Sequence, residues 1–237
     1  MNTLYLLGAG GHARVVLDMA QSLGHWERIL FLDDAFPERN QVQDIPVCGR
    51  LMQLNTLFRT GDDWLVAIGA NSARRFWLQH FSHLLPPALT LVHPSAVISR
   101  QAHIGAGSVV MPGAIINTGS HIGPGCIINT AATVDHDCQL QEAVHISPGA
   151  HLAGGVQVGA CSWLGVGSSV RQGIRIGSQV MVGAGAAVVS DIADQLTVVG
   201  VPARPLHAAS DTLKPKPRTD PAAADTNPML RMLSASH

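Results

Sequence analysis

The strongest constraint in this 237-residue sequence is an aliphatic residue at every sixth position of its second half. The series starts at Ile104 and runs through fifteen consecutive positions to Val188. The residue four places after each is Ser, Ala, Cys, Val or Ile throughout, from Ser108 to Ala186. A period of six fits neither a helix, which repeats about every 3.6 residues, nor a long alternating strand. We infer short strands joined by tight corners, with two of every six side chains facing one interior.

Glycine positions set the number of faces. Glycine follows the aliphatic residue at four positions that lie 18 or 36 residues apart: Gly105, Gly123, Gly159 and Gly177. One coil is therefore 18 residues long with three faces, which predicts a triangular parallel β-solenoid of about five coils. Cys126 and Cys138 take small inward positions, so we expect both in the core.

The first part of the chain is built differently, because nine of the ten aromatic residues lie at or before Phe81. We expect an α/β domain over residues 1–90, the solenoid over 91–206 and a disordered tail over 207–237. Apolar runs predict strands at 3–7, 29–32 and 64–68, a helix over 12–23 and a second helix after residue 71. This β-α-β order indicates a small parallel sheet, about one mononucleotide-binding half of a Rossmann fold.

Composition excludes several classes of protein. Charged residues are 13% and the formal net charge is −1, so no basic surface is available to bind nucleic acid. No apolar run approaches the roughly 20 residues of a membrane span, and the N-terminus lacks a basic leader region. The four cysteines have no metal-binding spacing. His103 and His121, 18 residues apart, are interpreted as repeated surface residues rather than a metal pair. We expect a cytoplasmic protein with reduced thiols and no metal.

A glycine turn follows the first predicted strand. The pattern Gly8-x-Gly10-x-x-Ala13 places backbone N–H groups and a helix N-terminus where a phosphate could sit. Asp33 and Asp34 follow the second strand and could meet ribose or base groups. The turn therefore predicts a phosphate-containing ligand, with a purely structural turn as the alternative. A nicotinamide reductase is disfavoured, because only about 90 residues precede the solenoid and a single glycine fingerprint is weak evidence.

One histidine of the solenoid is a candidate base. His136 lies at a corner, between Asp135 and Asp137. A carboxylate beside an imidazole can fix its tautomer and make it a better base for a proton from an attacking amine or hydroxyl. A solvated surface histidine is the alternative. His145, half a coil further on, also points outward, so the two histidines would meet only across a subunit boundary.

Six segments, in this order, resemble one family over residues 3–206. They are GAGGHARVV (8–16), FLDD (31–34), AIGANSARR (67–75), the hexapeptides, VDHDC (134–138) and GVPARP (200–205). The chain is similar to bacterial sugar acyltransferases, which include sialic acid O-acetyltransferases and the nucleotide-linked amino-sugar N-acetyltransferases of bacillosamine and perosamine synthesis. The resemblance implies a left-handed β-helix, a homotrimer, a nucleotide sugar on the N-terminal domain and acetyl-CoA in the cleft between subunits.

The resemblance also implies residue roles and direct transfer without an acyl-enzyme. His136 matches the general base and Asp137 the acid that orients it, where the amino-sugar enzymes typically have glutamate. Asn129 matches a polar residue near the acceptor, and His145 and Gly154 match contacts to the thioester and pantetheine. The positions that match the nucleotide-sugar site are Gly8, Gly10, Gly11, His12, Asp33 and Asp34, with Asn71 and Arg74.

Three hypotheses stay open on the sequence. The first is N-acetylation of a nucleotide-linked 4-amino sugar, which the acids Asp33 and Asp34 favour because they suit a nucleoside. The second is O-acetylation of sialic acid or a related sugar. The third is a non-catalytic solenoid that serves as a scaffold, which would lose nothing when His136 is replaced by alanine.

Overall fold

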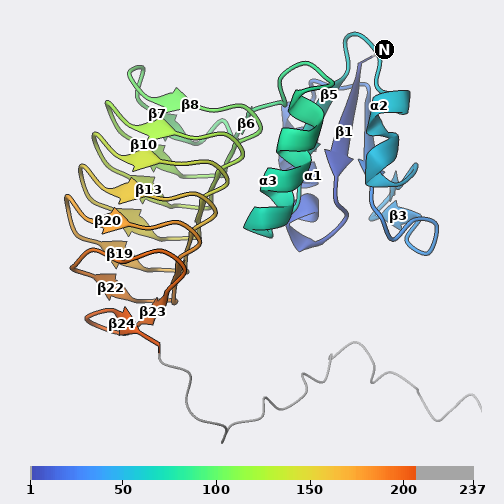
Figure 1. Ribbon diagram of the computed structural model, residues 1–237. Helices are drawn as coiled ribbons and strands as arrows, with labels where there is room; N and C mark the ends of the chain where they lie inside the picture. The colour runs from blue at the N-terminus through green and yellow to red at the C-terminus, as the bar shows by residue number, and fades with distance from the viewer. Residues whose placement is uncertain (1, 207–237) are drawn as a thin grey trace, which may run out of the picture. The chain divides into compact units, whose positions relative to one another are not determined.

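The computed structural model describes residues 2–206, in which a small α/β region precedes a parallel β-solenoid (Figure 1). Both predicted architectures, and their order, are confirmed. The predicted disordered tail, 207–237, lies outside the described residues. Within 2–206, no helix is long and apolar enough to cross a membrane.

The α/β region is built on a three-stranded parallel sheet with strand order β2-β1-β5. The strands are β1 (Thr3–Leu7), β2 (Arg28–Leu32) and β5 (Asp63–Val66). The helices α1 (Gly11–Leu23) and α3 (Asn71–Ser82) follow β1 and β5. Smaller elements are the hairpin β3 (Gln41–Val42) and β4 (Ile45–Pro46), a 3-10 turn (Leu51–Gln53) and α2 (Leu54–Leu57).

Alternation along β1 gives each helix one face of the sheet. Leu4 and Leu6 pack in one apolar cluster with α1, whereas Tyr5 and Leu7 pack in another with α3. Successive side chains of a strand point to opposite faces, which is why a strand covered on both sides is apolar throughout. All five residues of β1 are buried. The carboxyl ends of the three strands therefore open at one edge, beside the helix N-termini.

The solenoid consists of very short strands in three sheets, and from β6 to β22 each strand pairs with the one 18 residues away. The β7 sheet contains β7 (Val97–Ile98), β10 (Ile115–Ile116), β13 (Thr133–Val134), β16 (His151–Leu152), β19 (Ser169–Val170) and β22 (Ala187–Val188). The β8 sheet contains β8 (His103–Ile104), β11 (His121–Ile122), β14 (Gln139–Leu140), β17 (Gln157–Val158) and β20 (Arg175–Ile176). The β6 sheet contains β6 (Leu91–Val92), β9 (Val109–Val110), β12 (Ile127–Ile128), β15 (His145–Ile146), β18 (Trp163–Leu164), β21 (Met181–Val182), β23 (Thr197–Val199) and the antiparallel β24 (Arg204–Pro205).

The β7 sheet has six strands, so the solenoid has about six coils rather than the predicted five. The count was short because Val92 and Ile98, which precede Ile104 at the same spacing, also pack against the interior. That interior is a stack of aliphatic and small side chains. Cys126 and Cys138 lie in it as predicted, both fully buried free thiols.

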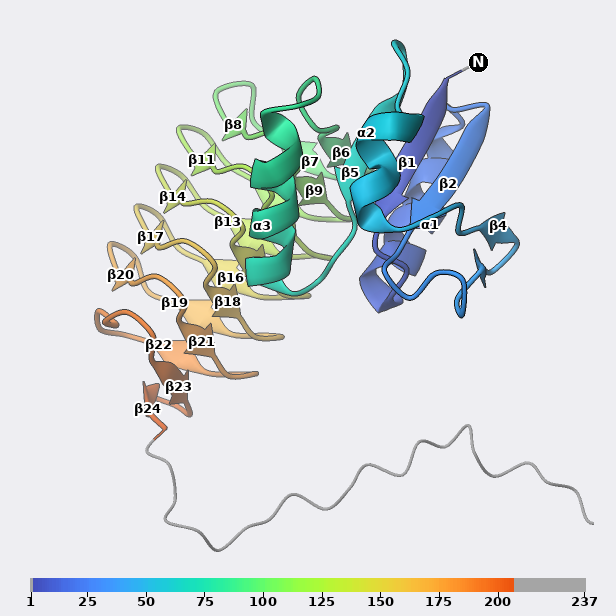
Figure 2. The same cartoon turned by 45° about the vertical axis from the view of Figure 1, so that its right-hand side comes forward.

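One face of the solenoid is covered by the α/β region (Figure 2). The outward residues of the first strands of the β6 sheet, Leu91 and Val109, belong to the same apolar cluster as α1 and β1. Further along this sheet, His145 is also buried, whereas Met181 is 40% exposed. Outward side chains of the β6 sheet are therefore shielded from solvent beside the α/β region and exposed beyond it.

Candidate functional site

The candidate base lies at the corner between β13 and β14. Asp135 accepts the backbone N–H of His136 at 2.8 Å and an amide N–H of Asn117 at 2.9 Å. Asp137 has a left-handed backbone with φ of 58°, and its Oδ2 lies 2.8 Å from His136 Nδ1. Both side chains are more than half exposed, at 57% and 70%. The corner thus presents an imidazole and a carboxylate outward as a bonded pair.

Glycines in the neighbouring coils make room for this pair. A Cβ on Gly154, one coil after His136, would overlap the imidazole at Nε2 and Cε1. A Cβ on Gly119, one coil before Asp137, would overlap its carboxylate. Gly154, for which the resemblance implied a pantetheine contact, therefore also forms the floor under the imidazole of its own chain.

The neighbouring acids raise the pKa of His136 above its ordinary value, chiefly through the hydrogen bond to Asp137 and then through the charges of Asp135 and Asp137. Because the carboxylate accepts from Nδ1–H, the neutral imidazole keeps its lone pair on Nε2. Nε2 is the nitrogen that faces Gly154. The arrangement can therefore take a proton from a group bound over Gly154.

His145 lies in a different environment, under the α/β region. Its ring stacks on Trp163, with centroids 4.5 Å apart, and it is only 6% exposed. Thr130 N–H donates to Asn129 Oδ1 at 2.8 Å, which turns the Asn129 amide N–H toward His145 Nε2 at 3.1 Å. Since Nε2 accepts, the neutral ring carries its proton on Nδ1. That nitrogen is buried and has no partner among the described residues.

All six positions expected to bind the nucleotide sugar's phosphates, ribose and base line one cavity of about 410 Å³, at the carboxyl ends of the three parallel strands. We call it the glycine cavity; its residues from the sequence prediction are Gly8, Gly10, Gly11, His12, Asp33 and Asp34. Such an edge is the usual ligand site of an open parallel sheet. Helix α1 begins after Gly10 without a side-chain cap, so its first N–H groups are free to bind an anion.

The two acidic residues of the glycine cavity, Asp33 and Asp34, have different roles. Asp33 accepts the Ala9 N–H at 2.7 Å and the Ala35 N–H at 2.9 Å, so it holds the glycine turn in place. Asp34 is exposed and, in the part of the chain that the structure describes, accepts only the Leu51 N–H at 3.2 Å, which leaves most of its carboxylate for a ligand. The sequence prediction missed Arg39, which lines the cavity 3.7 Å from Asp33 and adds a cation for a diphosphate. No motif or spacing in the sequence predicts that Arg39 belongs to this cavity.

His12, in the glycine cavity, and His145, on the solenoid, have pKa values lowered by the same causes. His12 lines the cavity, yet burial, and then the charge of Arg74, lower its pKa to about 4. The same two causes, with a smaller one from His12, lower the pKa of His145 to about 3. Nε2 of His12, like Nδ1 of His145, is buried without a partner among the described residues. Both imidazoles are therefore neutral near pH 7.

The structure places Asn71 and Arg74, which the resemblance matched to the nucleotide-sugar site, outside the lining of the glycine cavity. Both are buried between α3 and the solenoid, with exposures of 7% and 0%. Their polar groups are already used, since Asn71 donates to Cys161 O and Ser162 O and accepts from Arg74. The sequence carried a signal, because the buried residues of α3 form one helical stripe: Asn71, Arg74, Leu78 and Phe81.

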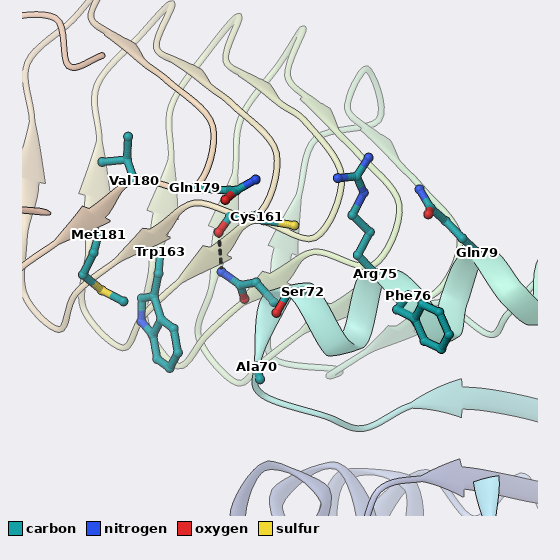
Figure 3. A pocket seen from close by; sticks show the side chains of 11 residues that line it. Ala70, Ser72, Arg75, Phe76, Gln79, Cys161, Trp163, Gln179, Val180 and Met181 are labelled. Atoms are coloured by element: carbon teal, nitrogen blue, oxygen red, sulfur yellow. Dashed lines mark hydrogen bonds between the residues drawn. The ribbon is translucent and has the colours of Figure 1, made fainter. Parts of the chain in front are cut away.

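A larger cavity, of about 670 Å³, lies between α3 and the later coils (Figure 3). In Figure 3 the indole of Trp163 lies beside Met181 on the solenoid, and Phe76 projects from the helix on the other side of the view. Of the predicted site residues only Asn71 lines it, through the bond to Cys161. Within residues 2–206, no group of three or more His, Cys, Asp or Glu side chains is arranged to hold a metal.

One chain does not bring the two halves of the site together. His136 and Gly154 lie where the β7 and β8 sheets meet, whereas His145 and Asn129 lie on or beside the β6 sheet. The contacts of His136 are with Asp135, Asp137 and Gly154. A thin prism separates its faces, so groups on different faces can share a ligand only where two copies meet.

Comparison with known proteins places this geometry in a family. The chain is similar to the acetyltransferase domain of PglB from Neisseria gonorrhoeae FA1090, solved in complex with acetyl coenzyme A, at 46% identity and TM-score 0.82. The similarity covers 86% of this chain and 98% of that one. The chain belongs to the bacterial hexapeptide-repeat sugar acetyltransferases. Residues 3–81 also match the PglD N-terminal domain.

Two further relatives belong to the same enzyme family. Perosamine N-acetyltransferase from Caulobacter crescentus, solved with CoA and GDP-perosamine, is 38% identical over 86% of this chain and 97% of that one, with TM-score 0.81. UDP-N-acetylbacillosamine N-acetyltransferase of Bacillus subtilis (strain 168) is 37% identical over 113 residues, which are 47% of this chain. The match spans about half, 52%, of that curated relative.

Proposed function

We propose that this chain transfers an acetyl group from acetyl-CoA to the amino group of a nucleotide-diphosphate-linked 4-amino sugar. The observation that carries the proposal is the exposed His136–Asp137 pair, bonded at 2.8 Å over the floor formed by Gly154. The relatives support the choice of substrates, because one is solved with acetyl coenzyme A and another with CoA and GDP-perosamine.

In the proposed reaction, His136 acts as general base. Its Nε2 takes a proton from the sugar amine as the nitrogen attacks the thioester carbonyl, and Asp137 holds the resulting imidazolium. The N–C bond forms, the C–S bond breaks, and the proton passes to the CoA thiolate as it leaves. No acyl-enzyme forms, and the enzyme works chiefly by holding the two substrates together.

His145 and Asn129 complete the proposed site from a neighbouring copy. The Nδ1–H of the neutral His145 is a donor without a partner among the described residues, and once the bound ligand makes it accessible it suits the oxygen of a thioester as negative charge develops on it. Because His136 and His145 lie on different faces of one chain, this step requires an oligomer. We infer the homotrimer that the family resemblance implies.

The glycine cavity is the proposed site for the nucleotide sugar, within an N-terminal domain of residues 1–90. Free N–H groups at the start of α1, with Arg39, suit a diphosphate, and the exposed Asp34 suits base or ribose groups. The amino sugar would then point from this cavity toward the solenoid of residues 91–206. The same proposal places the reaction in the cytoplasm, the compartment that supplies acetyl-CoA.

The proposal is tested by following free CoA thiol with UDP- and GDP-linked 4-amino sugars and with free sialic acid. Wild type should turn over one nucleotide amino sugar, and His136→Ala should lose about 10²–10⁴-fold in rate, the usual contribution of a general base. His103→Ala, an exposed histidine on the β8 sheet, is the matched control and should keep wild-type activity.

Each outcome decides between the hypotheses. Turnover confined to sialic acid would replace N-acetylation by O-acetylation. Binding of acetyl-CoA without turnover of any acceptor would contradict the proposed substrate class. Full activity of His136→Ala would remove the proposed base, and a wild type that neither binds acetyl-CoA nor turns over would favour a scaffold.

A further inference from the structure

Arg74 is a fully buried cation that has no carboxylate partner within residues 2–206. Its five N–H groups all donate to uncharged acceptors: Nε to Gly125 O at 2.6 Å, Nη1 to Ile68 O and Gly69 O at 3.0 and 2.9 Å, and Nη2 to Asn71 Oδ1 and Ala143 O at 2.7 and 3.0 Å. The nearby acid Glu142 pairs instead with Arg75, at the surface. Burial lowers the pKa of Arg74 to about 10, so the group stays charged at neutral pH.

These bonds join three parts of the molecule. Ile68 and Gly69 line the glycine cavity. Gly125 and Ala143 are equivalent corner residues of two successive coils, and both have a left-handed backbone, with φ of 65° and 54°. Asn71 extends the contact to the next equivalent corner, through Cys161 O. The cavity for the nucleotide sugar is therefore tied to three successive coils through one guanidinium and one amide.

The coils that Arg74 holds carry functional side chains. Asn129 follows β12, which begins two residues after Gly125, and His145 begins β15, two residues after Ala143. A shift of Arg74 would therefore move the rim of the cavity relative to both residues. Reacting groups must be held to within a fraction of an ångström, and a misplacement of about 1 Å can lower a rate about 10²-fold.

Burial of a charged side chain in this space costs free energy. An ion in a protein interior is unfavourable unless its bonds are fully satisfied, and an apolar side chain of similar size is often equally stable or better. The planar guanidinium of Arg74 is a rigid fork of five donors, and each donor has an acceptor. This arrangement indicates that Arg74 fixes the geometry of its surroundings and does not serve stability alone.

We propose that Arg74 is a positioning residue, which holds the nucleotide-sugar cavity in register with the coils that carry Asn129 and His145. The inference rests on the proposed function, because it assigns the cavity to the nucleotide sugar. Arg74 touches neither substrate; it acts through Ile68 and Gly69 on one side and through Gly125 and Ala143 on the other.

The charge of Arg74 supplies a second, independent readout. The charges that act on the pKa of His145 are those of Arg74 from α3 and, to a smaller extent, His12 from α1, and the charge that acts on the pKa of His12 is that of Arg74. Both imidazoles have pKa values lowered by burial first and by Arg74 next. Removal of the charge should therefore raise both pKa values part of the way toward the ordinary value, while loss of the fork alone should not.

Two variants separate the hydrogen-bonding geometry of the Arg74 guanidinium, its fork of five donors, from its charge. Arg74→Lys keeps the charge with three donors instead of five, and Arg74→Met removes both. We expect both variants to lower kcat and to raise KM for the nucleotide amino sugar about tenfold or more, with KM for acetyl-CoA within about twofold of wild type. In NMR titrations, the pKa values of His12 and His145 should rise in Arg74→Met and stay low in Arg74→Lys. Arg75→Met, the exposed neighbour on the same helix, should change neither readout.

Several results would overturn the proposal. A folded Arg74→Met with wild-type KM and unchanged imidazole pKa values would do so, as would equal rises of KM for both substrates. If Arg74→Met does not fold, Arg74→Lys decides alone, because a wild-type KM for the nucleotide sugar in that variant contradicts a role of the fork. Failure of the proposed function is distinguishable, because wild type would then turn over none of the acceptors, whereas the imidazole titrations need no substrate.

Discussion

His136 and His145 are the same type of side chain nine residues apart in one repeat, yet they have opposite properties. His136 is exposed at a corner, and an adjacent carboxylate raises its pKa. His145 is buried beneath the α/β region, and desolvation with a nearby cation lowers its pKa. His136 lies at a corner and His145 in a strand of the solenoid, and both side chains face outward. The difference arises from the carboxylate beside His136 and from the burial of His145, so the α/β region changes the properties of a side chain on the solenoid.

The largest expected effect is loss of stability in acid from the buried histidines. Their folded pKa values, about 4 for His12 and about 3 for His145, lie below the ordinary 6.5. Below pH 6.5 the unfolded chain binds more protons than the folded one, so this stability is complete above pH 6.5 and is lost as pH falls toward 4 and 3. Between pH 7.5 and 5 the loss should be on the order of 2 kcal/mol for each histidine.

Urea unfolding at the two pH values measures this loss. His145→Gln should reduce the difference between pH 7.5 and 5 by about half, whatever it does to stability at pH 7.5. His136 has the opposite sign, because stability from a raised pKa is complete below the unfolded pKa and is lost as pH rises through the folded one. His136→Gln should therefore leave the acid loss intact. If His145→Gln lost as much free energy of unfolding between pH 7.5 and 5 as wild type does, the contrast between His136 and His145 would be contradicted.

The next effect concerns the floor under the exposed base. In Gly154→Ala the new Cβ would overlap the imidazole of His136, which is free to turn away because it is exposed. We expect normal thermal stability but a loss of about 10²-fold in kcat, since the base leaves its working position. Adding Gly154→Ala to His136→Ala should cost nothing more, as coupled residues are not additive. A further loss in the double variant would show that Gly154 acts on the bound substrate instead.

A smaller effect follows from the partner of the base. Asp137→Asn removes the carboxylate that accepts from His136 Nδ1, so the pKa of His136 should fall toward its ordinary value. The acid limb of the rate profile should move to lower pH with it, and the maximal rate should fall about tenfold. Asp137→Glu restores the charge and is the control that should return the limb. An acid limb that stays in place in Asp137→Asn would mean that another group titrates there.

The sequence was informative wherever a residue's environment is local. The period of six determines the inward positions without knowledge of anything outside the solenoid, and the glycine turn and the acids after β2 meet because strand ends of a parallel sheet share an edge. His136 could be placed at its corner with Asp137 beside it for the same reason. These features depend on neighbours in the chain or on the repeat itself.

Features that depend on packing between the two regions were not predicted. Arg74 was matched to the nucleotide-sugar site by the family resemblance alone, although its position in the stripe with Leu78 and Phe81 indicates burial. The burial of His145 had a signal of the same kind, because the equivalent outward residues Val109 and Ile127 are apolar. Apolar side chains face outward from a solenoid only where another part of the protein covers them.

The smallest expected effect tests the surface counterpart of Arg74. Arg75 pairs with Glu142 at 2.6 Å, and Gln79 donates to the same carboxylate at 2.8 Å, which ties α3 to the solenoid at its exposed side. Exposed ion pairs contribute at most about 1 kcal/mol and are weakened by salt. Glu142→Gln should therefore lower the free energy of unfolding by at most that amount, less at high ionic strength, and leave KM for both substrates unchanged. If Glu142→Gln raised KM for the nucleotide sugar as Arg74→Lys is expected to, the register of the two regions would depend on the whole helix rather than on the buried fork.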